Sequence, residues 1–215
     1  MSGNPGEKRS TPIKRSPHKE SHDREHLIEI LDRSRVGHVA IDDGGPVVIP
    51  VAVAPWREAK ELLLHGSSAS RLFKRLSEGA PACVELTILE ALVLARSSFE
   101  SSMHYKSLVA FGSARALGSG EKEEALIALT EHLFPERSKE LRPSTEKELK
   151  ATSILAFPLD DYSIKVSNGE PKDPPEDLTL PVWAGIVPIH EVIGEPRPAK
   201  NLDPKIAAPD YIKRW

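Results

Sequence analysis

Apolar residues recur at helical spacing in three segments of the chain, and a fourth segment opens with a capping box. The three segments are residues 21–34, 69–76 and 121–135. In the fourth, residues 145–152, Thr145 can cap the first turn and Glu148 can reach back to the Thr145 backbone. We predict a helix in each segment, the first of them capped by Ser21 or Asp23.

Between these helices the pattern changes to that of β-strands. The segments rich in Val, Ile and Leu and bounded by turn residues are 36–43, 46–54, 59–66, 82–98, 106–117, 153–167 and 180–192. An Asp-Asp-Gly-Gly sequence joins the first two segments, which indicates a hairpin. Because helices and strands do not alternate regularly, we predict a mostly β chain, with an antiparallel barrel and peripheral helices.

The two ends of the chain differ in composition from its middle. Residues 1–20 are polar and charged, so they bury too little apolar surface to order themselves, and we expect a flexible N-terminal arm. Residues 191–215 are rich in proline, and we expect a tail that wraps the surface. The folded domain is therefore expected over residues 21–190.

Charge balance and cysteine usage narrow the function classes. The chain has 29 basic and 32 acidic residues, so its charge indicates neither a nucleic acid nor a membrane surface as partner. Cys83, the single cysteine, excludes an internal disulfide and is best interpreted as a small packed residue. Apolar runs stay well below the roughly 20 residues that span a bilayer. The first ten residues lack the apolar part of a signal peptide, so we expect a cytoplasmic protein.

The junction between the strand at 59–66 and the helix at 69–76 is the first candidate site. Three serines stand at the start of this helix, where free backbone N–H groups and the helix dipole attract anions. Three basic residues follow on the face opposite the apolar stripe. These residues are Ser67, Ser68, Ser70, Arg71, Lys74 and Arg75. Two interpretations stay open at this point: a cradle for a phosphate, or a serine-capped helix with a solvated basic face.

Other chemistry-bearing patterns are weaker. Residues 95–107 combine serines with His104, Tyr105 and Lys106, a pattern that a polar loop would also show. The histidines spaced four apart near the start of the chain lack an evident fourth ligand, so we predict no metal site there. The chain contains no GxGxxG, P-loop, HExxH or nucleophile-elbow motif, which argues against a Rossmann cofactor site.

Four pieces of the sequence together resemble the pyridoxamine 5′-phosphate oxidase-like superfamily of FMN-binding split barrels. They are VVIPVAVA (47–54), LLLHGSSASRL (62–72), LVLARSSFESSMHYKSLVAFG (92–112) and LPVWAGIVP (180–188). Their order and spacing carry the resemblance, which extends over nearly the whole folded part. The chain is most similar to the flavin-nucleotide-binding branch, which is related to the nitroimidazole-resistance proteins.

The resemblance implies a six-stranded antiparallel split β-barrel that forms a homodimer, with one FMN in each of two clefts at the interface. The residues expected at the phosphate are Ser70 and Arg71, with Ser67 and Lys74 as helpers. Those whose backbone is expected at the polar edge of the isoalloxazine ring are Val48, Ile49, Pro50 and Val51.

The same resemblance assigns the remaining candidates. His65 matches the strand-end histidine that faces the flavin in the nitroimidazole-resistance branch, and it is the candidate catalytic residue. Tyr105, Lys106 and Ser107 match the segment that closes the cleft, and Trp183 is a candidate wall for the ring or a substrate. Deazaflavin and haem, which relatives use, are alternatives to FMN. The C-terminal arginine-and-tryptophan signature of true pyridoxamine phosphate oxidases is missing, so that substrate is not expected.

Two functions from different classes are compatible with this resemblance. In the first, an FMN-dependent oxidoreductase reduces a small planar molecule stacked on the flavin, and the protein supplies orientation and electrostatics. In the second, the protein binds flavin without turnover, as a carrier or sensor. We favour the enzyme, because Trp183 and Tyr105 can wall a flat substrate.

Overall fold

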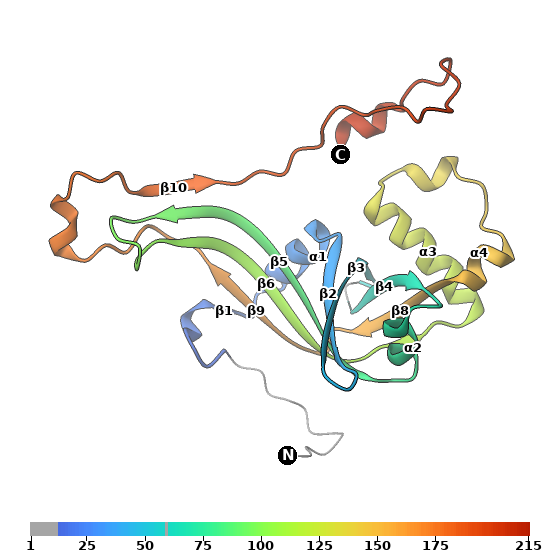
Figure 1. The fold of residues 1–215 in the computed structure, drawn as a ribbon, viewed down its shortest axis with the longest axis horizontal. Coiled ribbons are helices and arrows are strands. Elements are labelled where there is room, and N and C mark those ends of the chain that lie inside the picture. The colour runs from blue at the N-terminus through green and yellow to red at the C-terminus, as the bar shows by residue number, and fades with distance from the viewer. Residues whose placement is uncertain (1–12, 59) are drawn as a thin grey trace.

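A computed structural model describes residues 13–58 and 60–215, and its strands form one antiparallel sheet (Figure 1). The order is β1-β9-β6-β5-β2-β3-β4-β8-β7, and β10 pairs with β5. The long strands are β2 (Val36–Asp42), β3 (Pro46–Trp56), β4 (Glu61–Ser67), β5 (Pro81–Leu94), β6 (Ser102–Ser113), β8 (Thr152–Pro158) and β9 (Asp161–Ser167). The short ones are β1 (Glu20–Ser21), β7 (Arg115–Ala116) and β10 (Gly185–Pro188).

The mostly β class and the antiparallel pairing are confirmed, but the six-stranded barrel is corrected to an open sheet of 10 strands in the described residues. The segment at 153–167 is two strands rather than one, because the chain turns after Pro158 and the halves join different neighbours. β8 pairs with β4, and β9 pairs with β6. The strands of two to four residues are too short to show a period in the sequence.

The four predicted helices are confirmed. They are α1 (Arg24–Arg33), α2 (Arg71–Ser77), α3 (Ser119–Leu133) and α4 (Glu146–Ala151), and 3₁₀ turns η1 (Pro17–Lys19), η2 (Arg137–Glu140), η3 (Pro175–Thr179) and η4 (Asp210–Arg214) accompany them. Asp23 caps α1 by accepting from the backbone N–H of Glu25 at 2.9 Å. In α4, Glu148 accepts from the backbone of Thr145 at 2.8 Å, which closes the predicted capping box.

One face of the sheet forms the main core. Alternate residues of the strands point to it, among them Val39 of β2 and Leu86 of β5, both fully buried. Ile30 of α1 packs onto the same cluster. α2 lies against the end of β4, where the ring of Phe73 is so close to Gly66 that a Cβ there would meet it at 2.2 Å. Glycine at this position therefore holds α2, and the loop before it, tightly against the sheet.

The opposite face, here called the outer face, is covered by α3 over part of its area. Ala125 and Leu129 of α3 pack on Ala54 and Leu63 in a second apolar cluster. Because an amphipathic helix is stabilised mainly by the apolar surface it buries, this contact accounts for the position of α3.

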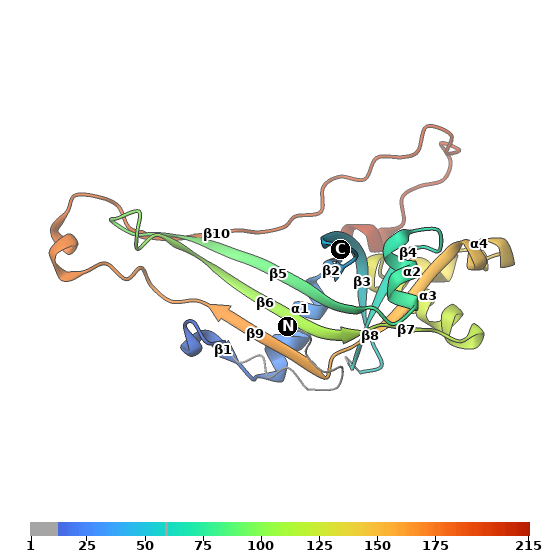
Figure 2. The same cartoon turned by 60° about the horizontal axis from the view of Figure 1, so that its bottom comes forward.

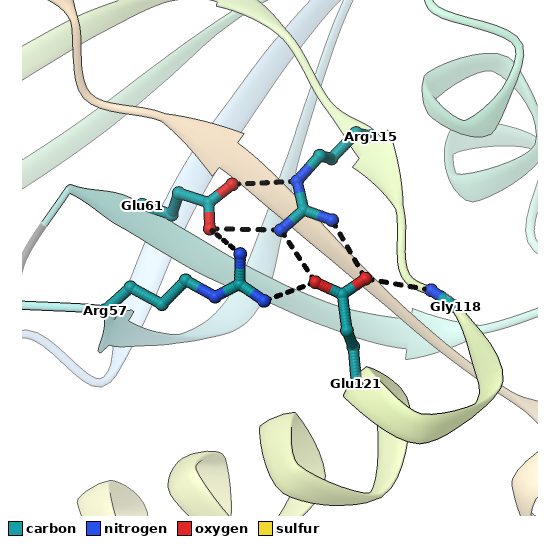
Figure 3. Close-up of polar contacts among 5 residues, drawn as sticks. All are labelled: Arg57, Glu61, Arg115, Gly118 and Glu121. Carbon is teal, nitrogen blue, oxygen red and sulfur yellow. Dashed lines mark hydrogen bonds and ion pairs between the residues drawn. The ribbon is translucent and has the colours of Figure 1, made fainter.

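An ionic network ties the start of α3 to the strands (Figure 3). The guanidinium of Arg115 donates to Glu61 at 2.8 Å and to Glu121 at 3.1 Å, and Arg57 also pairs with Glu121. Glu121 in addition accepts from the backbone N–H of Gly118 at 3.1 Å. The hydrogen bond from Arg115 and then the one from Gly118 lower the pKa of Glu121 to about 2. This network joins β4, β7 and the first turn of α3.

The two ends of the chain differ from expectation in opposite ways. The expected N-terminal arm lies outside the described residues up to residue 12, whereas Glu20–Ser21 forms β1 and pairs with β9. The C-terminal tail does not wrap the surface throughout, because residues 190–208 are exposed along their whole length. β5 and β6 extend far beyond the other strands as a ribbon, and β10 lies along it (Figure 1). Every helix in the described residues is too short or too polar to cross a membrane.

Candidate functional site

The part of the outer face that α3 leaves uncovered, here called the open face, gathers most of the polar side chains that point away from the core. Strand register places them, because directly paired residues lie on the same face of a sheet. Ala52 of β3 pairs with His65 of β4 and with Val36 of β2. Two residues further along the strands, His38 pairs with both Pro50 and Glu85.

His65 lies half-buried in this face. Burial lowers the pKa of the His65 imidazole below its ordinary value, so the ring is neutral at neutral pH. Within residues 13–58 and 60–215 the ring makes no hydrogen bond and no ion pair. A buried or half-buried polar group normally has a partner. The ring nitrogens of His65 are therefore available to a ligand.

His38 is a second imidazole on the open face, and its setting differs. Its Nδ1 lies 3.2 Å from a carboxylate oxygen of Glu85, and the hydroxyl of Thr87 donates to the other oxygen of that carboxylate. Nε2 of His38 has no hydrogen bond among the described residues. A carboxylate on one ring nitrogen fixes the orientation and the tautomer of an imidazole and leaves the other nitrogen for chemistry.

Sequence reasoning missed this pair. Alternation in VGHVAID places His38 opposite the core, and alternation in CVELTIL does the same for Glu85, so each residue was recognisable as exposed. Their contact depends on the pairing of β2 with β5, which no local pattern reveals.

Small residues separate the two imidazoles. Pro50 and Ala52 of β3 lie between His38 and His65. From two strand spacings and one two-residue step, the two Cα atoms are about 12 Å apart. No long side chain of β3 stands between them, so a planar group can approach both rings.

The edge of β3 beside this floor has free backbone groups. β3 pairs with β2 from Pro46 to Ala52, but its pairing with β4 begins only at Ala52. Among the described residues, the backbone of 46–51 therefore has no strand partner on the side away from β2. Pro50 on this stretch agrees with an edge position. Backbone donors and acceptors are thus exposed where the sequence predicted the polar edge of a flavin ring.

The start of α2 lies at the end of β4, next to His65. Ser70 is the N-cap of α2, and its hydroxyl makes no capping hydrogen bond. Arg71, the expected phosphate ligand, pairs with Asp43 of the β2–β3 turn at 2.6 Å, and Arg75 approaches the same carboxylate at 3.3 Å. Lys74 has no ion pair in the described residues. The serines and basic residues expected at a phosphate thus lie together at this helix start, and Asp43 neutralises part of their charge.

The structure divides the expected β6 residues between two faces. Tyr105 and Ser107 lie on the open face, because they pair with Leu89 and Thr87. Lys106 lies on the core side, where its ammonium contacts Glu29 at 2.9 Å and Glu90 at 2.8 Å.

Burial alone would lower the pKa of Lys106. The hydrogen bonds to Glu90 and Glu29 outweigh that effect and raise the pKa above its ordinary value. Lys106 is thus held charged inside a structural ion-pair cluster.

The other expected residues also separate. Val48 and Pro50 share the open face with His65, whereas Ile49 and Val51 alternate to the core side. Trp183 stacks against Gly185, which pairs with Leu94 near the tip of the ribbon. That position is about 30 Å along β5 from Glu85. Within one chain, the structure does not bring Trp183 to His65.

Two cavities of the single chain lie elsewhere. One, of about 330 Å³, is lined by Asp32, Arg33, Arg35, Ile189, His190 and Glu191. The other, of about 440 Å³, is lined by Arg24, Ile28, Asp32, Pro55, Trp56, Arg57 and Glu58. Neither includes a residue of the expected flavin site.

Comparisons with known proteins show what this chain is similar to. The sequence model of the pyridoxamine 5′-phosphate oxidase family matches residues 23–166. No curated protein matches the chain.

Among solved structures, the FAD- and haem-binding protein of Mycobacterium smegmatis is 40% identical, with a TM-score of 0.86 over 91% of this chain and 96% of that one. The flavocytochrome Anf3 of Azotobacter vinelandii is 33% identical, with a TM-score of 0.86 over 94% of each chain. A putative 5-nitroimidazole antibiotic resistance protein of Bacteroides thetaiotaomicron, 18% identical, has a TM-score of 0.57 over 80% of this chain and 90% of that one, which shows a shared fold.

Proposed function

This chain belongs to the pyridoxamine 5′-phosphate oxidase family, and we propose that it is a homodimeric oxidoreductase that binds a flavin and haem. Two structures that match it over most of their length are named as an FAD- and haem-binding protein and as a flavocytochrome. When bound, a flavin supplies hydride and single-electron transfer, and haem iron supplies single-electron transfer. The protein's part is to bind and orient both groups.

The observation that carries the haem part of the proposal is the environment of His65. Haem iron is commonly held by a histidine, which must be neutral to ligate. His65 is neutral, half-buried and without a partner in the described chain, and its cross-strand neighbours are the small Ala52 of β3 and the apolar Ile154 of β8. His38, oriented by Glu85, is the second imidazole on this face and the alternative ligand. The residues present therefore fit a haem.

The flavin part depends on the free edge of β3 and on the start of α2. Backbone groups of 46–51 suit the polar edge of an isoalloxazine ring, and Ser70 with Arg71 suits phosphate oxygens. FMN was expected because the cradle resembles a site for a terminal monophosphate. Asp43 weakens that argument, because it pairs with both Arg71 and Arg75. Together with the FAD named in a similar structure, this pairing favours FAD over FMN.

Exposed apolar side chains support the homodimer. On the open face Val48 is 61% exposed and Val36 is 52% exposed, and Leu89, Leu92 and Met103 continue the surface along the ribbon. Several large apolar side chains exposed on one face are typical of protein interfaces. Two copies that pair through this surface would enclose the imidazoles and exclude water from the cofactors.

Cofactor identity is tested on the purified protein. We expect FAD to be retained in preference to FMN when the protein is incubated with both, as measured by mass analysis of the flavin released on denaturation. Added haemin should give a sharp Soret band. His65→Ala should weaken haem binding by more than about 100-fold, since loss of even an outer partner of a ligand costs about 10–100-fold. His22→Ala, at an exposed histidine away from the open face, is the control.

Turnover is tested separately. The protein loaded with flavin is reduced without oxygen, and quinones, nitroaromatics and oxygen are added one at a time while flavin absorbance is followed. Faster reoxidation than that of free reduced flavin supports the oxidoreductase. If none of these acceptors reoxidises the bound flavin faster than it reoxidises free reduced flavin, the protein is a flavin carrier or sensor. Retention of FMN with no haem uptake would overturn the haem part and restore the FMN expectation.

A further inference from the structure

The C-terminal segment is attached to the rest of the chain at both ends. At its start, β10 pairs with β5, and the backbone N–H of Ile189 donates to the carbonyl of Glu90 at 2.9 Å. At its end, Tyr211 of η4 is buried and donates its hydroxyl to the carboxylate of Glu140 at 2.8 Å. The indole of Trp215 donates to the carbonyl of Pro135 at 3.1 Å.

Between these attachments the chain stands away from the body. Every residue from 190 to 208 is exposed, and Val192 is 85% exposed. The backbone hydrogen bonds of this part, such as Leu202 to Ala199, are local turns, and among the described residues none reaches the body. Figures 1 and 2 both show a separate length of chain between β10 and the C-terminal turn. We call residues 190–208 the strap.

A free strap would not keep this form in water. Its exposed apolar side chains would gain free energy by collapsing onto the body. Fixing each residue costs roughly 1–2 kcal/mol of backbone entropy, and among the described residues no hydrogen bond from the strap to the body offsets it. The strap also borders a cavity of about 330 Å³, between His190 and the end of α1. A strap that is held away from the body along its length indicates that another molecule fills the space beneath it.

The composition of the strap identifies the chemistry of that molecule. Its acidic residues are Glu191, Glu195 and Asp203, and its basic residues are Arg197, Lys200 and Lys205, so three charges of each sign cancel. A neutral strap has no electrostatic basis for binding nucleic acid or an anionic membrane. Its exposed large apolar residues are Val192, Ile193, Leu202 and Ile206. A segment with exposed apolar side chains and no net charge suits the surface of a folded protein.

Both attachments are made to the same chain, so the strap and the body form a closed loop. A folded partner that arrives later could enter such a loop only if one of the two attachments opened. A second copy of this chain avoids the difficulty, because two copies can fold and associate together. The strap also follows β10, which pairs with Leu92 and Leu94 of the ribbon, so it starts close to the apolar surface assigned to the dimer.

We propose that the strap clasps a second copy of this chain, so that each subunit of the homodimer is held by the strap of the other. The inference rests on the homodimer of the proposed function, and it assigns residues 190–208 to the interface. It does not depend on which cofactor is bound.

Isotope-mixed crosslinking tests the clasp on the full-length protein. Unlabelled and ¹⁵N-labelled chains are mixed in denaturant, refolded together and crosslinked through lysines. Native mass spectrometry first establishes the oligomeric state and the presence of mixed dimers. If the strap clasps the partner, crosslinks from Lys200 and Lys205 to lysines of the body join light to heavy chains in about half of the products. The internal control is Lys122 to Lys150, which should join residues of one chain.

The outcomes separate this proposal from the homodimer. A dimer in which strap crosslinks never mix isotopes would overturn the clasp and leave the homodimer standing. A protein that is monomeric at micromolar concentration would contradict both the clasp and the homodimer. As a second measurement, the double variant Val192→Ser with Ile193→Ser should raise the dimer dissociation constant at least about tenfold. The control Ile127→Ser, at an exposed residue of α3, should leave it unchanged, and equal effects of the two variants would contradict the clasp.

Discussion

Along β5, Val84 and Leu86 point into the main core, whereas Glu85 and Thr87 point outwards beside His38. The same alternation runs through β2, β3, β4 and β6, so one set of strands builds two different surfaces. The core face is apolar and closed, and the open face carries imidazoles, hydroxyls and exposed valines. Stability and ligand chemistry are therefore assigned to opposite sides of the same strands, and variants on one side should leave the other largely unchanged.

The largest effect is expected on the core face. Phe157 is fully buried, and Phe157→Ala should lower the free energy of unfolding by about 3–5 kcal/mol, measured by urea denaturation. The matched change on the open face is Val48→Ala, at a residue that is 61% exposed. The free energy of unfolding of this variant should lie within about 0.5 kcal/mol of that of the natural protein at low protein concentration. Similar losses for the two variants would contradict the division between faces.

A smaller effect is expected at Lys106. Lys106→Met leaves Glu29 and Glu90 without their shared ammonium and should cost about 1–3 kcal/mol of stability, with flavin affinity unchanged. Lys106→Arg, which keeps the charge, should lose less stability than Lys106→Met. The comparison is made by urea denaturation and by flavin titration of the folded protein. A fall in flavin affinity at unchanged stability would return Lys106 to the cofactor site.

Where α3 covers the outer face, the ion pairs of Glu121 should make the stability of the protein depend on pH in the acid range. Its pKa is about 2 in the folded chain and has an ordinary value of 4.5, so its contribution to stability is present above pH 4.5 and is lost as the pH falls towards 2. The urea midpoint of Glu121→Gln should therefore lie below that of the natural protein at pH 6, and the two should converge near pH 2.5. A constant difference across this range would argue against the network of Figure 3.

The smallest expected effect is the titration of His65 on the open face. Because burial lowers its pKa, the unfolded chain takes up the proton at higher pH than the folded chain does. Stability should then fall as the pH drops below about 6.5, and His65→Asn should remove that part of the fall. NMR titration of the ring should give a midpoint below 6.5. A midpoint above that value would mean that the ring has a partner that favours its charged form.

The structure keeps some of the expected site residues together and separates the side chains of others, and the sequence already contained a reason for that separation. His65 at the end of a strand and Ser70 at the start of a helix are neighbours in the chain, and the structure keeps them together. Tyr105, Lys106 and Ser107 were all expected at one cleft. Strand alternation directs the side chain of the middle residue to the other face of the sheet. Lys106 accordingly lies in the ion pairs with Glu29 and Glu90.

Other features had no local signal. Asp43 neutralises Arg71 across the gap between the β2–β3 turn and α2, and nothing in either segment points to the other. The pair His38 and Glu85 forms only because β2 lies beside β5. The ribbon includes a register shift between Leu89 and Ala91, which changes the faces of the residues beyond it.

By itself, the sequence determined the features that depend on neighbours within a few residues. Caps such as Asp23 and Thr145, the apolar stripes of the helices, and the junction that joins His65 to α2 are of this kind, because their hydrogen bonds and periods are local. Tertiary structure alone decided which strands pair, which side chains meet across them, and that residues 190–208 stand away from the body. Those outcomes depend on burying the core faces of segments far apart in the chain, and many local patterns are compatible with the same burial.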